Sequence, residues 1–126
     1  MLYHTAICVH DVARTAAFYD KVLAVLGYRR VWDLMPEAVG WGEDRGVFWA
    51  QTPKSQGSPD ISRQCHFAFG AKDEATVRAF YDAALAAGGK PDTPPAAHPE
   101  FSAGYFGGRV WDIDGNKIEI LVHPRP

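Results

Sequence analysis

The sequence has few of the features that mark secreted or membrane proteins. Only two of its 126 residues are cysteine, Cys8 and Cys65, and both fall in stretches typical of strands, so two free, buried thiols in a reducing compartment are expected. No apolar run approaches the roughly 20 residues that cross a bilayer, and the first residues lack the charged and apolar regions of a signal peptide. We therefore expect a cytoplasmic protein that makes no use of a membrane.

An excess of charge of either sign is also missing. Lysine and arginine number 13, aspartate and glutamate 15, and the formal net charge is -2. No basic run offers a surface for phosphate groups, so nucleic acid is not expected as a partner. With 47% apolar and 22% charged residues, the composition is that of an ordinary globular protein, and the length predicts one domain over residues 1–126.

What the sequence does contain is an internal repeat. A shift of 62 positions superimposes residues 4–27 on residues 66–89 without a gap, and 11 of the 24 positions are identical. His4 falls on His66, and the Ala-Phe-Tyr-Asp segment at residues 17–20 recurs at residues 79–82. Each copy of such a repeat is one supersecondary unit, so two similar modules packed about a pseudo-two-fold axis are predicted.

The first copy has clear punctuation. Asp11 is a helix-capping residue and Gly27 a helix-ending one, with apolar side chains between them at intervals of three and four residues. A helix from Asp11 to about Leu26 is therefore predicted. Strands are predicted on either side of it, at residues 3–9, 28–34, 38–42 and 47–52.

The second copy repeats this order. Strands are predicted at residues 65–69, 104–111 and 117–122, with a helix from Asp73 to about Gly88. Residues 90–103 are rich in proline and are expected to form either a lid or an irregular loop. The fold class predicted is α+β, with one βαβββ module over 1–53, a connector over 54–64, and a second βαβββ module over 65–126.

Three side chains on these strands form a candidate metal site. The repeat places His4 and His66 alike in the two modules, and Glu119 lies on the last strand, where a carboxylate is costly to bury unless it is paired or bound to a metal. Each histidine alone is more typical of a hydrogen-bonded strand residue than of a ligand. Two imidazoles and one carboxylate together make a three-ligand set for a divalent transition metal, with positions open for water or substrate.

Four segments of the sequence resemble a known family. They are residues 3–7 (Tyr-His-Thr-Ala-Ile), the helix and its end at residues 17–28, residues 66–69 (His-Phe-Ala-Phe), and residues 112–119 (Asp-Ile-Asp-Gly-Asn-Lys-Ile-Glu). Together they resemble the vicinal oxygen chelate superfamily, which includes glyoxalase I, extradiol dioxygenases, fosfomycin-resistance proteins and bleomycin-resistance proteins. The likeness covers nearly the whole chain and is specific for the superfamily rather than for one activity.

This resemblance implies paired βαβββ modules in an open, barrel-like mixed sheet, with His4, His66 and Glu119 at three metal-ligand positions. The metal it implies is one divalent ion of Zn, Fe, Mn, Ni or Co. The fourth ligand position of glyoxalase-type enzymes falls on Trp49, because residues 44–49 are spaced like residues 114–119; Gln51 is a poorer match. Tryptophan does not bind metals, so the glyoxalase I reaction, which uses the fourth carboxylate as a base, is in doubt.

Two functions follow from the resemblance. The first is a metal-dependent lyase, isomerase or dioxygenase that binds a small substrate through vicinal oxygens. The alternative is a metal-free protein of the bleomycin-resistance type that binds a small molecule or drug. A homodimer is expected in either case, because dimerisation covers exposed sheet edges.

Further polar and aromatic residues are candidates for contact with a substrate. His98 and Tyr105 are the candidate catalytic residues, able to donate a proton or hydrogen bond if the 90–103 segment closes over the site. Arg109 is a candidate for holding a carboxylate, and Trp49 for contacting an apolar ligand. The remaining candidates are weaker and are Trp32, Trp41, Glu100, Trp111 and His123.

Overall fold

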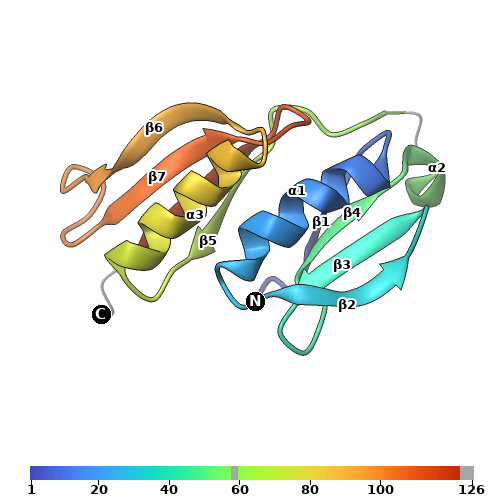
Figure 1. Cartoon of the computed structure of the whole chain (residues 1–126), viewed down its shortest axis with the longest axis horizontal. Helices are drawn as coiled ribbons and strands as arrows, with labels where there is room; N and C mark the ends of the chain where they lie inside the picture. Colours follow the sequence, from blue (N-terminus) through green and yellow to red (C-terminus); the bar gives the residue numbers. More distant parts are fainter. Residues whose placement is uncertain (58–59, 123–126) are drawn as a thin grey trace. The chain divides into compact units, whose positions relative to one another are not determined.

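The computed structural model describes residues 1–57 and 60–122, and these divide into two compact units, Met1–Arg63 and Gln64–Pro126. His123, named above as a weak candidate, lies outside the described residues. Among the described helices, none is long and apolar enough to cross a membrane. Each unit consists of a four-stranded sheet with one long helix packed against it (Figure 1).

The first unit has the order predicted from the sequence. Its elements are β1 (Thr5–Cys8), α1 (Val12–Ala24), β2 (Arg29–Leu34), β3 (Ala38–Gly42), β4 (Phe48–Gln51) and the short α2 (Pro53–Gln56). The strands lie in the order β1-β4-β3-β2, with β1 parallel to β4 and the other pairs antiparallel. The helix α2 begins at the last residue of the predicted first module and continues into the predicted connector; Thr52 caps it and Pro53 starts it.

Local signals account for the boundaries of α1. The Asp11 side chain accepts a hydrogen bond from the backbone N–H of Arg14 at 3.0 Å, which satisfies one of the donors left free at the start of a helix. After the helix, Gly27 adopts a φ of 78°, a left-handed conformation that glycine takes without strain. Within the apolar stripe between these residues, Tyr19 and Leu23 are completely buried.

The second unit repeats the architecture. Its elements are β5 (His66–Gly70), α3 (Glu74–Ala86), β6 (Lys90–Ala97), β7 (Phe106–Trp111) and β8 (Lys117–Val122), with the strand order β5-β8-β7-β6. Asp73 caps α3 as Asp11 caps α1. The prediction of an α+β protein made from two βαβββ modules is therefore confirmed.

One expectation about the second unit is wrong. The proline-rich segment that begins at Lys90 is neither a lid nor an irregular loop up to residue 97, because Lys90–Ala97 forms β6 and pairs with β7. This strand lies at the edge of its sheet, where proline is tolerated since one row of backbone groups has no ladder to join. The pairing shifts register twice, between Pro91 and Thr93 and between Thr93 and Ala96, which accommodates the prolines.

The two cysteines also differ from expectation in part. Both are free, as predicted, and Cys8 is buried at the end of β1. Cys65 is exposed and directly precedes β5, so it is not the buried strand residue that the sequence pattern indicated. Burial raises the pKa of the Cys8 thiol, which keeps it protonated at neutral pH.

Candidate functional site

In the second unit, the carboxylate of Glu119 is the centre of a polar network. Glu119 lies on β8 with 8% of its surface exposed. One carboxylate oxygen, Oε2, accepts a hydrogen bond of 2.5 Å from the hydroxyl of Tyr105, and the other, Oε1, lies 2.9 Å from Nε2 of His66. Arg109, directly across the ladder on β7, places its Nε 3.6 Å from Oε1. Four of the predicted site residues are therefore neighbours.

The network determines the charge of its members. Burial by itself would raise the pKa of Glu119, but the hydrogen bonds from Tyr105 and His66 and the charge of Arg109 outweigh it, and the pKa lies below its usual value. Burial and the hydrogen bond to Glu119 raise the pKa of Tyr105 to about 12. At neutral pH the site therefore contains an ionised carboxylate and a neutral phenol whose proton is already directed at Glu119.

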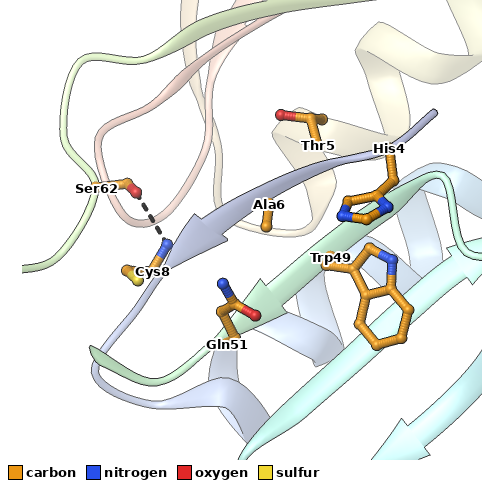
Figure 2. A pocket seen from close by; sticks show the side chains of 7 residues that line it. All are labelled: His4, Thr5, Ala6, Cys8, Trp49, Gln51 and Ser62. Atoms are coloured by element: carbon orange, nitrogen blue, oxygen red, sulfur yellow. Dashed lines mark hydrogen bonds between the residues drawn. The ribbon is translucent and has the colours of Figure 1, made fainter. Parts of the chain in front are cut away.

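In the first unit, His4 borders a different kind of cavity. Its volume is about 690 Å³, and its lining comprises His4, Thr5, Ala6, Cys8, Trp49, Gln51 and Ser62. Figure 2 shows His4 and Trp49 at one end of this cavity, Cys8 and Ser62 at the other, and Gln51 between them. The His4 and Trp49 rings meet edge to face with centroids 6.4 Å apart, and the Ser62 hydroxyl accepts a hydrogen bond of 2.9 Å from the backbone N–H of Cys8.

Trp49 occupies the position that Glu119 has in the other unit. Ala6 of β1 pairs with Trp49 of β4, just as Ala68 of β5 pairs with Glu119 of β8, and Ala6 and Ala68 are themselves equivalent in the repeat. The predicted equivalence of the two residues is thus confirmed by the strand register. Gln51, two residues further along β4, is on the same face and also lines the cavity.

Two glycines fix the indole of Trp49. A Cβ atom on Gly40, which pairs with Trp49 on β3, would lie 2.7 Å from indole atom Cε2, and one on Gly46 would lie 2.8 Å from the same ring. The indole N–H donates a hydrogen bond of 3.1 Å to the Gly46 carbonyl. The indole ring therefore lies against the backbone of Gly40 and Gly46, where any larger residue would displace the ring.

The three predicted metal ligands lie in different units. His66 and Glu119 are neighbours in the second, and His4 belongs to the first. Within residues 1–57 and 60–122, no three His, Cys, Asp or Glu side chains form a group placed to hold a metal ion. His66 and Glu119 nevertheless suit a divalent metal chemically, because one offers an imidazole nitrogen and the other a buried, ionised carboxylate.

The loop between β6 and β7 encloses a second, smaller cavity. Residues 98–105 form this loop, and its ends are joined by a hydrogen bond from the His98 N–H to the Tyr105 carbonyl. The cavity measures about 190 Å³ and is lined by Thr93, His98, Glu100, Phe101, Tyr105, Gly107, Gly108 and Arg109. The structure thus brings His98, which the sequence analysis placed in the 90–103 segment, close to Tyr105 and Arg109 of the predicted strand 104–111.

Two residues in this loop were missed or undervalued by the sequence analysis. Glu100 was only a weak candidate, yet its carboxylate lies 2.8 Å from Nδ1 of His98. Phe101 was not a candidate, yet its ring stacks on His98 at 5.0 Å, and the Arg109 guanidinium lies 5.2 Å from its centroid. A two-residue spacing between histidine and glutamate in a short loop was the available signal, since such neighbours reach each other easily in a turn.

The other weak candidates have structural roles. Trp41 is completely buried and donates its indole N–H to Asp20 at 2.9 Å. Lys117 lies 4.7 Å from the centroid of the Trp111 ring. Trp32 is 55% exposed on β2, so it is a surface residue rather than part of either cavity.

Solved structures of known proteins share this fold. A glyoxalase/bleomycin resistance protein from Albidiferax ferrireducens T118 matches with a TM-score of 0.81 and 27% identity, over 97% of this chain and 98% of that one. Lactoylglutathione lyase from Agrobacterium tumefaciens matches with a TM-score of 0.68 and 22% identity, over 97% of this chain and 92% of that one. TioX from Micromonospora sp. ML1 matches with a TM-score of 0.73 and 16% identity, over 98% of this chain and 99% of that one.

The family is settled by the sequence rather than by these distant structures. Among curated proteins, none matches the chain significantly. The family model described as Glyoxalase/Bleomycin resistance protein/Dioxygenase superfamily matches residues 2–120, which is nearly the whole chain. The protein therefore belongs to the glyoxalase/bleomycin resistance protein/dioxygenase superfamily.

Proposed function

We propose that the protein is a metal-dependent enzyme that acts on a small oxygenated substrate, with His4, His66 and Glu119 as ligands of one divalent ion. The observation that carries this proposal is the distance of 2.9 Å between His66 Nε2 and Glu119 Oε1. Two ligands that each lie about 2.0–2.1 Å from the same ion are roughly 2.8–3.4 Å apart at bond angles of about 90–109°. The spacing suits joint coordination as well as a direct hydrogen bond.

The charge of the site also favours a cation. Glu119 is ionised although it is buried, and an ionised carboxylate is the form that binds metals. Zn, Fe, Mn, Ni and Co all accept a mixed set of imidazole and carboxylate ligands. When bound, such an ion would supply a Lewis acid that polarises substrate oxygens.

The surrounding residues have proposed roles of their own. His98 and Tyr105 are the proposed catalytic residues, and Arg109 and Trp49 the proposed substrate contacts. Tyr105 also positions Glu119, because its hydroxyl donates to Oε2 and leaves Oε1 facing His66. Trp49 argues against the lactoylglutathione lyase activity of the Agrobacterium protein in this chain. It stands opposite Ala6, at the strand position that Glu119 has in the second unit. An indole at this position neither binds a metal nor accepts a proton.

Metal analysis of single variants tests the proposal. The untagged protein should retain about one ion per chain, and the conservative variants His4→Gln, His66→Gln and Glu119→Gln should each lose it. Added metal at a hundredfold excess over Kd should stabilise the wild type by about 2.7 kcal/mol and leave these variants unchanged. His10→Gln, which changes an exposed histidine, is the matched control and should behave as the wild type.

Two results would overturn this assignment. A wild-type protein that takes up none of the five metals would refute the metal site altogether. Loss of metal in the His66 and Glu119 variants with full retention in His4→Gln would refute the three-ligand set and limit the site to the second unit.

A second function is favoured by the cavity of the first unit. Its volume of about 690 Å³ and the fixed indole of Trp49 suit a metal-free protein that binds a small molecule or drug, as bleomycin-resistance proteins do. The Glu119 carboxylate, already engaged by Tyr105 and Arg109, would then be structural. Tryptophan fluorescence that changes with an aromatic ligand, loses this response in Trp49→Phe and ignores added metal would support this function over the first.

The protein is further proposed to be a homodimer. β2 and β6 each lie at an edge of their sheet, but β6 carries three prolines whereas β2 carries none and exposes Trp32 and Leu34. Proline discourages pairing at an edge, and exposed apolar side chains favour it. A second copy of the chain is therefore expected to cover β2.

A further inference from the structure

The loop cavity of the second unit has a property that the proposed function does not use. Nε2 of His98 is buried, and within the described part of the chain it has no hydrogen-bond partner. Buried polar atoms are nearly always paired, so an unpaired ring nitrogen in the wall of a cavity indicates a missing partner inside it. The cavity that His98 lines, at about 190 Å³, is large enough for more than one water molecule.

The neighbour of His98 determines what kind of partner is missing. Glu100 Oε1 lies 2.8 Å from Nδ1, and hydrogen bonds from its own backbone and from His98 lower the pKa of this carboxyl. An ionised carboxylate only accepts hydrogen bonds, so Nδ1 of His98 carries a proton. In the tautomer whose single proton is on Nδ1, Nε2 carries a lone pair, and the partner that it lacks is a hydrogen-bond donor.

The other walls define the shape and charge of that donor. The rings of His98, Phe101 and Tyr105 cluster with centroids 5.0–5.8 Å apart, which favours a flat, apolar body. Arg109 also lines the cavity, and its positive charge would stabilise an oxygen that becomes negative as it gives up its proton. Since Glu119 already offsets the charge of Arg109, a neutral ligand fits better than a full anion.

We propose that this cavity binds a small planar compound with an acidic hydroxyl group, of the phenol or enol class, whose O–H is donated to Nε2 of His98. If the proton transfers, it moves from the ligand oxygen to Nε2, the oxyanion faces Arg109, and the imidazolium is held by Glu100. His98 is then a base, and Glu100 is the positioning residue that keeps its lone pair directed into the cavity. The site shares His98, Tyr105 and Arg109 with the function proposed above, but its test needs no metal, so its failure is distinguishable from failure of the metal site.

A titration of the full-length protein with 4-nitrophenol in the presence of EDTA tests this site. The phenol and phenolate forms absorb at different wavelengths, so binding and proton transfer can both be followed. We expect one probe per chain, with absorbance shifted toward the phenolate form relative to buffer at the same pH. 4-Nitroanisole, which has the same ring but no O–H, should bind roughly tenfold more weakly, as expected for a lost hydrogen bond in a buried site.

Two variants assign the contact. His98→Phe keeps an aromatic wall but removes the acceptor, so it should weaken 4-nitrophenol about tenfold and leave 4-nitroanisole unchanged. Glu100→Gln should weaken 4-nitrophenol less and reduce the shift toward phenolate, because the amide cannot stabilise the imidazolium. His10→Phe is the matched control, since it makes the same substitution at an exposed histidine of the first unit.

The proposal is overturned if no probe binds, if 4-nitroanisole binds as tightly as 4-nitrophenol, or if His98→Phe binds 4-nitrophenol like the wild type. Should His98→Phe not fold, nitrogen NMR of the wild type decides the question. Addition of 4-nitrophenol should then shift the Nε2 resonance of His98 far more than its Nδ1 resonance, and equal or absent shifts would refute the contact.

Discussion

Trp49 and Glu119 occupy equivalent strand positions, and the size and polarity of their neighbours determine what each side chain can do. Trp49 lies over Gly40 and Gly46, where only the absence of a side chain makes room for an indole. Glu119 is instead surrounded by donors, of which Tyr105 is the closest at 2.5 Å. The two halves of the repeat therefore differ at the position that the family resemblance implies for the fourth metal ligand of glyoxalase-type enzymes.

The packing of Trp49 leads to a prediction about Gly40. Gly40→Ala would place a Cβ 2.7 Å from the indole, so the ring must move, and we expect a loss of about 1–3 kcal/mol in the free energy of unfolding. The indole N–H resonance that disappears in Trp49→Phe should also shift. Gly70→Ala is the control, because nothing lies within 4 Å of the added Cβ, and it should change stability by less than about 0.5 kcal/mol. Equal effects of the two substitutions would refute this packing argument.

The sequence predicted the equivalence of Trp49 and Glu119 but not the contacts of Glu119. The equivalence of Trp49 and Glu119 followed from spacing alone, because a strand after a tight turn has a fixed register. The contacts of Glu119 did not follow, since the predicted strands at residues 104–111 and 117–122 carry no information on side-chain conformation, and Tyr105 and Arg109 reach Glu119 only in particular conformations. Their roles, and those of His4 and His66 at a metal, stay predictions.

At the scale of elements, one carboxylate of α1 adds hydrogen bonds to the apolar packing of this helix on its sheet. Asp20 accepts hydrogen bonds from Nε and Nη2 of Arg30 on β2, at 2.9 and 2.7 Å, and from Trp41 on β3. Burial would raise the pKa of Asp20, but the hydrogen bonds from Arg30 and Trp41 lower it overall. The repeat supplies a natural comparison, because Asp82 occupies the same position of α3 and is exposed.

Asp20→Asn should therefore destabilise the protein by roughly 1 kcal/mol, a modest value because the pair is partly exposed. Since the folded pKa of Asp20 is below the unfolded one, its stabilisation is present above the unfolded value and is lost as the pH falls through the folded one. Denaturant unfolding should show the difference between wild type and variant at pH 7 and its disappearance in acid. Asp82→Asn should have little effect at either pH, and an equal effect would contradict the assigned role of Asp20.

The elements themselves were predictable to different degrees. Helices α1 and α3 were found because Asp11 and Asp73 cap them and an apolar stripe follows each. Strand β6 was not, because Pro91, Pro94 and Pro95 indicate a loop unless it is known that the strand lies at an edge. Edge position is a property of the whole sheet and has no local signal.

At the scale of the whole molecule, the repeat was sufficient to predict two βαβββ modules. The resemblance of four segments was sufficient to predict the superfamily. That the two modules form a single domain over residues 1–126 remains a prediction, as does the homodimer. Composition and periodicity could not supply them, because both depend on which surfaces meet rather than on which elements form.

The expected dimer is tested at β2. Leu34 is 53% exposed on this edge strand, and Leu34→Lys should convert the dimer to a monomer in sedimentation velocity at micromolar concentration. Leu2→Lys makes the same substitution at a residue that is 78% exposed and lies outside the strands, and it should leave the dimer intact. A monomeric wild type, or a dimer that persists in Leu34→Lys, would refute this interface.

The glycines beneath Trp49 also limit which single substitutions residue 49 tolerates. A carboxylate at this position would leave an unfilled space over Gly40 and Gly46, with the cost of any large-to-small replacement. To make residue 49 like residue 119 would therefore need changes at several positions at once. The two halves of the repeat can diverge further at this position more easily than they can become alike.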